Sequence, residues 1–144
     1  MKKIDEVSRL TGLSKRTLQY YDDEGILLIK RTEKNHRIFG PDALERIWQI
    51  LIYKEMGFKL KEIKKLLELS NAQKDIYFIK QVESIKNQII TLKVRMGFIS
   101  TIRVNGIPLK PDEQSGKTYV GSITEIREEI KKIFMVEETN DENE

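Results

Sequence analysis

The segment that determines the fold is residues 14–21, Ser14-Lys15-Arg16-Thr17-Leu18-Gln19-Tyr20-Tyr21. Ser14 is a favourable N-cap, because its hydroxyl accepts a hydrogen bond from a free backbone N–H of the first helical turn. The residues after it predict a short helix that ends near Gly25. Upstream, Ile4, Val7 and Leu10 recur at helical spacing up to Thr11-Gly12 and predict an earlier short helix. Two short helices joined through a glycine turn indicate a helix-turn-helix.

The next segment has the pattern of a β-hairpin. Residues 26–39 place β-type side chains on either side of a polar tip, Glu33-Lys34-Asn35-His36, and Asn35 tolerates the positive φ that a hairpin turn requires. We interpret this hairpin as a wing. Pro41 then begins a helix, whose apolar stripe stops at Gly57. The stripe consists of Leu44, Ile47, Trp48, Leu51 and Met56, and a shorter helix with Leu60, Ile63 and Leu67 follows.

A heptad seam dominates the middle of the chain. Its positions alternate four- and three-residue steps and are Phe78, Val82, Ile85, Ile89, Leu92, Met96 and Ile99. The 22 residues span about 33 Å at ~1.5 Å per residue, which is too long a stripe for the small N-terminal head to cover. We therefore expect a second copy of the chain to cover it, and the protein to be a homodimer.

The C-terminal part is predicted to be a loop and one short helix. The segment 106–116 contains two prolines and reads as a loop, and Ser122 with Glu125 has the spacing of a capping box that opens a last helix. Its apolar positions are Ile126, Ile130, Ile133 and Phe134, and the acidic residues 137–144 are expected to be disordered. The predicted division is 1–71 for the head, 72–103 for the dimerisation helix and 104–144 for an effector or packing segment.

Composition excludes several classes of protein. The chain has no cysteine, so thiol redox sensing and thiolate metal sites are excluded. It has no apolar run near the ~20 residues of a membrane helix and no signal peptide, so we expect a cytoplasmic protein without membrane contact. A single histidine and the lack of a phosphate-binding glycine loop argue against an enzyme, and we expect no cofactor and no bound metal.

The front part of the chain is basic. Residues 1–68 carry 15 Lys and Arg against 11 Asp and Glu, which suits a polyanionic partner. In a helix-turn-helix, polar residues of the second helix meet base edges and phosphates in the major groove of DNA. The candidate DNA-binding residues are Lys15, Arg16, Thr17, Gln19, Tyr20 and Tyr21 on that helix, Arg31, Lys34, His36 and Arg37 on the wing, and Lys59 and Lys61 at a later helix start. The alternative is a capped surface helix whose cations face water.

Three motifs follow one another in the first half of the chain. They are Thr17-Leu18-Gln19-Tyr20-Tyr21, the wing from Arg31 to Phe39, and Met56-Gly57-Phe58-Lys59-Leu60-Lys61-Glu62-Ile63. In this order they resemble the DNA-binding head of the MerR family of bacterial regulators. The resemblance covers residues 4–69, and the heptad helix has the placement of the family's antiparallel dimerisation helix. Gln19 departs from the pattern at a position where arginine is common, Asn35-His36 replaces a Gly-aromatic pair, and Phe39 lacks the usual tyrosine hydroxyl.

The resemblance implies a mainly α-helical regulator with a winged helix-turn-helix head, a long antiparallel coiled-coil helix and a short C-terminal helix. It implies a homodimer that binds double-stranded promoter DNA and distorts the spacer for RNA polymerase, as activator or repressor, with a small molecule as a possible effector. The alternatives are an excisionase-like or architectural DNA-bending protein and a module that binds only proteins. The lack of cysteine argues against the metal and redox effectors of some family members.

Overall fold

The computed structural model describes residues 1–141, and their side chains as far as Phe134. The chain divides into two compact units, residues 1–77 and 78–144, which we describe separately. The elements of the first unit are β1 (Lys2–Lys3), α1 (Ile4–Thr11), α2 (Lys15–Asp23), β2 (Lys30–Arg31), β3 (Arg37–Phe39), α3 (Pro41–Glu55) and α4 (Leu60–Leu66). Helix α5 (Asn71–Asn105) passes from the first unit into the second, which also holds η1 (Glu113–Ser115) and α6 (Tyr119–Asp141).

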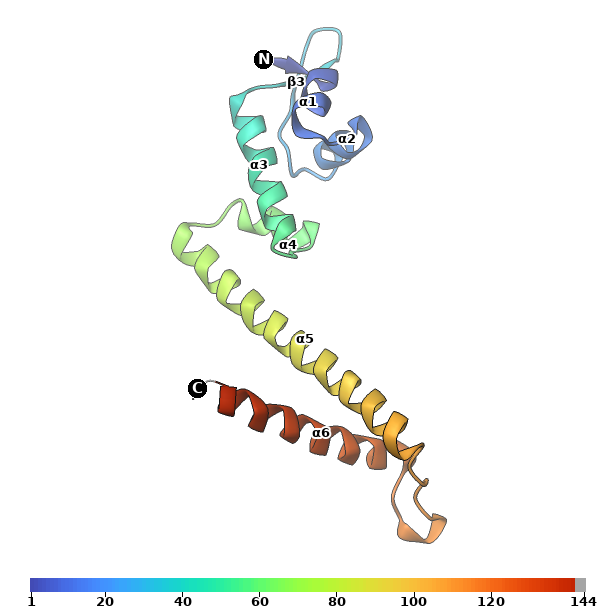
Figure 1. Ribbon diagram of the computed structural model, residues 1–144. Coiled ribbons are helices and arrows are strands. Elements are labelled where there is room, and N and C mark those ends of the chain that lie inside the picture. Colours follow the sequence, from blue (N-terminus) through green and yellow to red (C-terminus); the bar gives the residue numbers. More distant parts are fainter. Residues whose placement is uncertain (142–144) are drawn as a thin grey trace. The chain divides into compact units, whose positions relative to one another are not determined.

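The first unit contains the predicted helix-turn-helix (Figure 1). Gly12 adopts φ 77° at the end of α1, and the Ser14 hydroxyl accepts a hydrogen bond from the Thr17 backbone N–H at 3.1 Å. These are the turn and the N-cap that the sequence predicts. The two helices pack on α3 and α4 around a core of fully buried side chains, which includes Val7, Leu18, Phe39, Ile47, Ile50, Ile63 and Leu66. The mainly helical fold and the helix-turn-helix are therefore confirmed.

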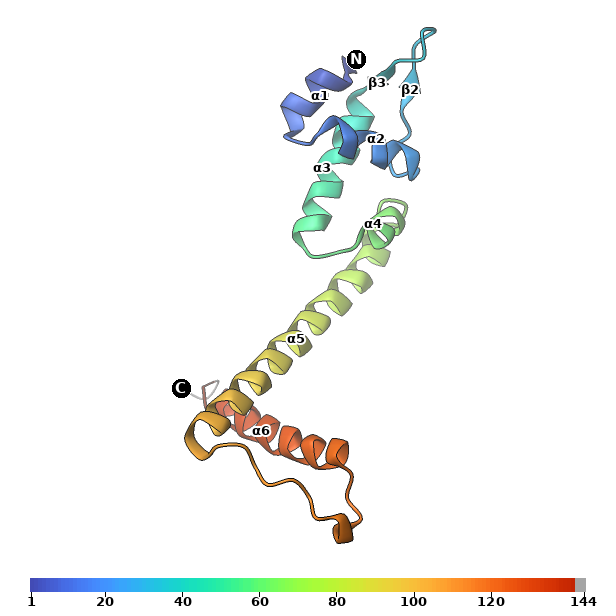
Figure 2. The same cartoon turned by 90° about the vertical axis from the view of Figure 1, so that its right-hand side faces the viewer.

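A small antiparallel sheet carries the wing (Figure 2). Its strand order is β1-β3-β2, with Lys2 paired to Phe39 and Arg31 paired to Arg37. Asn35 has φ 64°, as the hairpin turn requires. The hairpin is confirmed, but the third strand was not predicted, because two residues at the start of the chain give no period of their own.

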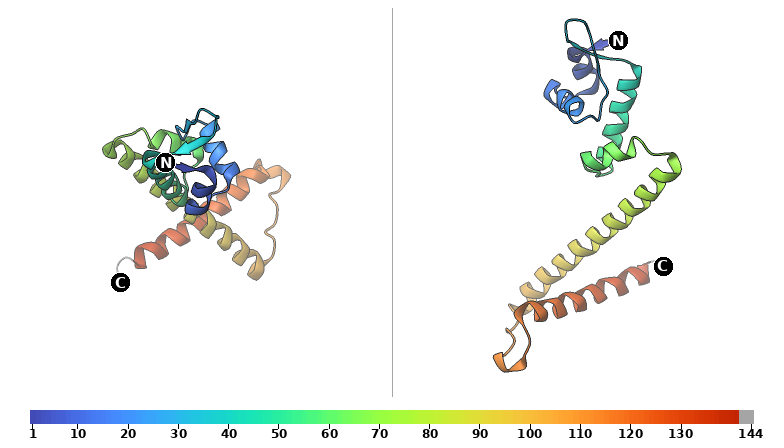
Figure 3. Two further views of the ribbon diagram at one scale, coloured as in Figure 1. Left: turned by 90° about the horizontal axis from the view of Figure 1, so that it is seen from above. Right: turned by 180° about the vertical axis from the view of Figure 1, so that it is seen from behind.

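In the second unit α6 crosses α5 instead of running along its whole length (Figure 3). The close approach lies at Gly97, where an added Cβ would come within 2.5 Å of Ile130 Cγ2 and 2.7 Å of Phe134 Cε2. Ile130 is buried there, together with Val94. A glycine without a side chain thus allows the two helices to meet.

The heptad seam lies on the other side of α5. Val94 faces α6 and is 5% exposed, whereas Leu92 is 55% exposed. Residues that are two positions apart on a helix, such as Leu92 and Val94, point in directions that differ by about 200°. The covered face and the seam are therefore nearly opposite. The six seam positions from Val82 to Ile99 are all exposed within this chain, and Phe78 is half-buried.

Three local expectations were wrong. Helix α6 begins at Tyr119, so Ser122 lies inside its first turn, and the Thr118 hydroxyl caps the helix by accepting from the Gly121 N–H at 2.9 Å. The same helix continues to Asp141, into the acidic segment 137–144 that was expected to be disordered; residues 142–144 lie outside the described residues. Trp48 belongs to the apolar stripe of α3 but is 61% exposed. Among the described residues, no helix is both long and apolar enough to cross a bilayer.

Candidate nucleic-acid interface

The outer face of α2 carries the candidate base-reading residues. Arg16, Gln19 and Tyr20 are exposed, and the Arg16 guanidinium has no hydrogen bond or ion pair to any described residue. Leu18 points the other way, into the core. The helical period therefore separates a buried anchor from an exposed polar face, which is the arrangement that a recognition helix needs.

Lys15, at the start of this face, is held by an acidic neighbour. Its ammonium forms an ion pair with the Asp5 carboxylate of α1. The hydrogen bond and charge of Lys15 lower the pKa of Asp5 below its ordinary value. Both side chains are exposed, so the pair contributes little to the stability of the fold. Its main effect is to lower the net positive charge at the start of α2.

Thr17 takes part in the N-cap of α2 through its hydroxyl and its backbone N–H. Its hydroxyl lies 2.9 Å from the Ser14 hydroxyl, and its backbone N–H is the donor to the cap. A threonine hydroxyl has both a donor and acceptor lone pairs, so it retains capacity for another partner.

The wing tip presents Lys34 and His36 to solvent. The tip is closed by the Thr32 backbone N–H, which donates to the His36 carbonyl at 2.8 Å, and by the Thr32 hydroxyl, which accepts from the His36 N–H at 3.1 Å. These bonds involve the backbone of His36, so its imidazole is not used by the turn.

One carboxylate joins the wing to α2. Arg37 Nε of β3 donates to Asp22 Oδ2 at 2.8 Å, and Arg31 Nη2 of β2 lies 3.6 Å from the same oxygen. Asp22 is only 16% exposed, whereas Asp23, 3.5 Å from Arg37 Nη2, is 69% exposed. From the sequence, the acids Asp22-Asp23-Glu24 are interpreted as a helix end on the surface and not as catalytic residues, and the surface position is wrong for Asp22. The opposite charge of the wing was the signal that could have indicated this contact.

A cleft of about 300 Å³ separates α2 from the wing. Gln19 of α2 and Arg31, His36 and Arg37 of the wing line it. Lys3 of β1 lines it too, and sequence reasoning missed it because its position depends on the unpredicted strand. The structure therefore brings residues of the two predicted DNA-binding elements to one concave surface.

Tyr21 does not belong to that surface. It is 2% exposed, and its hydroxyl lies 3.4 Å from Lys54 Nζ of α3. Its ring is 6.4 Å from that of Tyr20, between centroids. The buried position favours a packing role for Tyr21, beside the exposed Tyr20.

Lys59 and Lys61 lie at the start of α4, and both are exposed. The Lys59 backbone N–H donates to the Glu62 carboxylate at 3.2 Å, which caps the helix without using the Lys59 ammonium. Helix α4 is tied to the end of α2 by Lys64 Nζ, which donates to the Glu24 carbonyl at 3.0 Å. No group of acidic or histidine side chains among the described residues is suited to a metal ion.

Comparison with known proteins identifies the family. The model of the MerR HTH family regulatory proteins matches residues 2–70. The mercuric resistance operon regulatory protein of Bacillus cereus is 33% identical over 98 residues, which cover 63% of this chain and 74% of that protein. The chain belongs to the MerR family. This is a family of regulators and not of enzymes.

Solved structures of MerR family proteins share the fold. The N-terminal part of the Bacillus subtilis multidrug transporter activator, MtaN, is 28% identical and superposes with a TM-score of 0.68, covering 73% of this chain and all of that one. HiNmlR, a MerR family regulator that lacks the sensor domain and was crystallised bound to promoter DNA, is 25% identical, with a TM-score of 0.50 over 72% of this chain and 94% of that one.

This chain spans only about half the length of several curated relatives. It covers 46% of the transcriptional activator TipA of Streptomyces coelicolor, at 32% identity over 115 residues.

Proposed function

We propose that this MerR family protein is a transcription regulator that binds promoter DNA as a homodimer. The observation that carries the proposal is the concave surface between α2 and the wing, where Gln19, Arg31 and His36 meet, with Arg16 exposed on the same helix as Gln19. A recognition helix placed in the major groove would bring the wing toward the adjacent backbone. HiNmlR, whose fold this chain shares, was crystallised on promoter DNA.

In this proposal Arg16, Gln19 and Tyr20 face bases and phosphates in the major groove. Lys34 and His36, at the wing tip, contact the phosphate backbone of the DNA. Arg31 and Arg37 act mainly by holding the wing through Asp22. Lys59 and Lys61 add phosphate contacts beside the head.

The exposed seam supports the dimer. Its side chains would remain in water in an isolated chain, including Ile85, Ile89 and Leu92. Burying such side chains against a second copy is favourable by ~25 cal/mol per Å² of apolar surface. We infer an antiparallel pair of α5 helices, as in the family pattern, with the two heads on opposite ends.

We further propose that the dimer distorts the promoter spacer for RNA polymerase. Bending a DNA site of roughly 20–30 base pairs costs about 1–6 kcal/mol, so contacts from two heads are needed to offset this cost. Two half-sites on one side of the duplex lie ~34–36 Å apart, comparable with the ~33 Å span of the seam.

Footprinting with purified RNA polymerase tests this function. The expected result is protection of a promoter spacer upstream of the protein's own gene, with altered reactivity at its centre and a changed transcript level. Protection confined to recombination sites, with no effect on transcription, would support the excisionase-like alternative instead. Absence of protection on every duplex at low salt would contradict both.

A further inference from the structure

A second cleft, of about 520 Å³, lies between α5 and α6 within the second unit. Its floor is apolar and is formed by Ile90, Val94, Phe98 and Ile123. Its rim is polar and is formed by Thr91, Arg95, Arg127, Glu128 and Lys131. The volume falls within the range of roughly 300–1,000 Å³ that is typical of small-molecule sites.

The rim is unbalanced in charge. Arg95, Arg127 and Lys131 face the single carboxylate of Glu128, and none of the three has an ion pair or side-chain hydrogen bond to a described residue. By contrast, Lys86 of α5 does have a partner and lies 3.6 Å from Glu83. The cleft therefore combines an apolar floor with an uncompensated positive rim, which is complementary to an anion that carries an apolar group.

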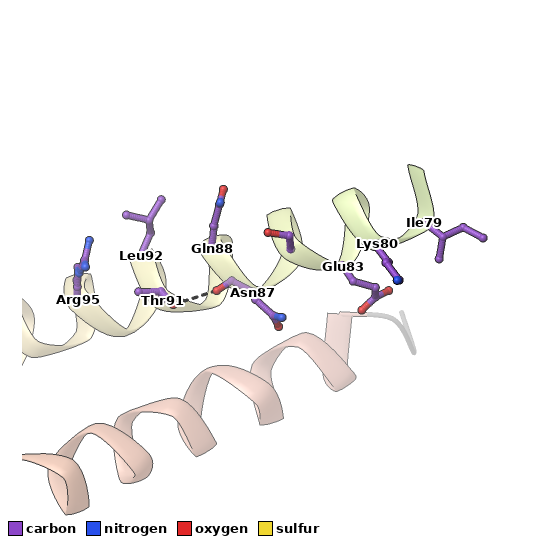
Figure 4. Close-up of a pocket in the computed structure, with 9 residues that line it drawn as sticks. Ile79, Lys80, Glu83, Asn87, Gln88, Thr91, Leu92 and Arg95 are labelled. Carbon is purple, nitrogen blue, oxygen red and sulfur yellow. Dashed lines mark hydrogen bonds between the residues drawn. The ribbon is translucent and has the colours of Figure 1, made fainter. Parts of the chain in front are cut away.

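The proposed dimer leaves the Val94 side of this cleft open. Val94 lies on its floor, and the seam residue Leu92 is about 200° away around the helix. In Figure 4 the side chains of Leu92 and Gln88 point away from α6, whereas that of Asn87 lies on the side of α6. Covering the seam with a second copy therefore does not cover the Val94 side of the cleft, whereas Thr91 and Arg95 also line the pocket of Figure 4 that contains Leu92.

We propose that this cleft binds an amphipathic carboxylate. The alkyl group lies on Val94, Phe98 and Ile123, and the carboxylate lies between Arg127 and Lys131. A guanidinium matches a carboxylate with two parallel hydrogen bonds, and the apolar floor disfavours a small, strongly hydrated anion. This assignment does not depend on DNA binding; if the protein regulates a promoter, the carboxylate is a candidate effector.

Isothermal titration calorimetry of the full chain with decanoate, below its critical micelle concentration and without DNA, tests the proposal. We expect saturable binding of one decanoate per chain and no binding of decyltrimethylammonium, which has the same alkyl group and the opposite charge. Arg127→Gln with Lys131→Gln should weaken the affinity roughly tenfold. The matched control is Lys132→Gln, which removes the neighbouring exposed cation of α6 outside the cleft and should change the affinity by less than about twofold.

A second variant tests the floor. Ile123 is half exposed, so Ile123→Asp should be tolerated by the fold, which circular dichroism checks, and should abolish decanoate binding by placing a like charge in the cleft. The proposal is overturned if decanoate does not saturate, if the cationic analogue binds equally well, or if Lys132→Gln weakens binding as much as the rim variant. None of these outcomes bears on DNA binding.

Discussion

Arg37 of the wing and Asp22 of α2 form the contact that joins the two halves of the proposed DNA-binding surface, with Nε 2.8 Å from Oδ2. Both side chains are less than one fifth exposed. Because Asp22 also lies 3.6 Å from Arg31, a single carboxylate forms ion pairs with one cation on each strand of the hairpin. The wing cations that the sequence assigns to DNA are therefore shared between the fold and the ligand.

Asp22→Asn should destabilise the head by about 1–3 kcal/mol, because it removes the closer and less exposed of the two carboxylates that pair with the poorly solvated Arg37. Chemical denaturation followed by circular dichroism measures the change. Asp23→Asn is the matched control: its carboxylate is exposed and its ion pair is longer, so the loss should stay below about 1 kcal/mol. Equal effects of the two substitutions would contradict the structural role of Asp22.

Asp5→Asn should raise the affinity for random DNA at low salt. The substitution removes the carboxylate paired with Lys15 and so adds one unit of positive charge beside the start of α2. The salt dependence of binding should become steeper, by about one unit of slope if the freed lysine contacts a phosphate. Glu113→Gln, which makes the same charge change in the second unit, should have little effect on either quantity.

The pH dependence of the Lys15–Asp5 pair follows from the lowered pKa of Asp5. A depressed carboxyl pKa means that the pair is present above the ordinary value of ~3.9 and is lost as pH falls through the lowered value. The effect of Asp5→Asn should thus be the same at every pH between about 5 and 8. A marked change within that range would contradict the pair.

Arg16→Ala should weaken specific binding by about 1–3 kcal/mol if the guanidinium reads a base. The measurement compares the affinity for the protected promoter site with that for a random duplex. A selective loss on the promoter site indicates base reading, and an equal loss on both indicates a phosphate contact. Arg103→Ala removes an exposed arginine from α5 and should change neither affinity, and an unchanged affinity for Arg16→Ala would exclude Arg16 from the interface.

Much of the fold could be predicted because its signals are local. The Ser14 cap, the positive φ of Asn35 and the helix start at Pro41 are each specified by one or two residues, and the structure contains all three. The seam was found because seven positions repeat one spacing over a single helix. Such patterns do not depend on the rest of the chain.

The parts that were missed depend on contacts between distant segments. Strand β1 exists because Lys2 pairs with Phe39, and the role of Asp22 exists because the wing folds back on α2. Tyr21 was a candidate for DNA contact and Trp48 was placed in an apolar stripe, yet Tyr21 is buried and Trp48 is exposed, since tertiary packing decides which face of a helix is covered. For the same reason the cleft between α5 and α6 could not be derived from either helix alone.

Gly97→Leu should detach α6 from α5. A side chain at this position would overlap Ile130 and Phe134, so the helices would have to separate. Limited trypsin digestion followed by mass spectrometry should show faster cleavage after Arg127 and Lys131, with the head still resistant. Ser100→Leu adds the same side chain at an exposed position of α5 and should leave the digestion rate unchanged. If α6 is as resistant to trypsin in Gly97→Leu as in the unsubstituted protein, the packing of α6 on α5 at Gly97 is contradicted.

Ile89→Lys with Leu92→Lys should convert the dimer to a monomer. Both side chains are exposed in the isolated chain and lie near the centre of the seam, so the two substitutions would bury charges in the apolar contact between the copies. Light scattering coupled to size-exclusion chromatography measures the mass. Ser84→Lys with Asn87→Lys adds the same charge to exposed polar positions of α5 outside the seam and should leave the mass unchanged. Because one head makes only half of the contacts, the monomer should also lose most of its affinity for a promoter with two half-sites. The melting temperature of the head should not change. If the double variant is still a dimer, the seam assignment is wrong.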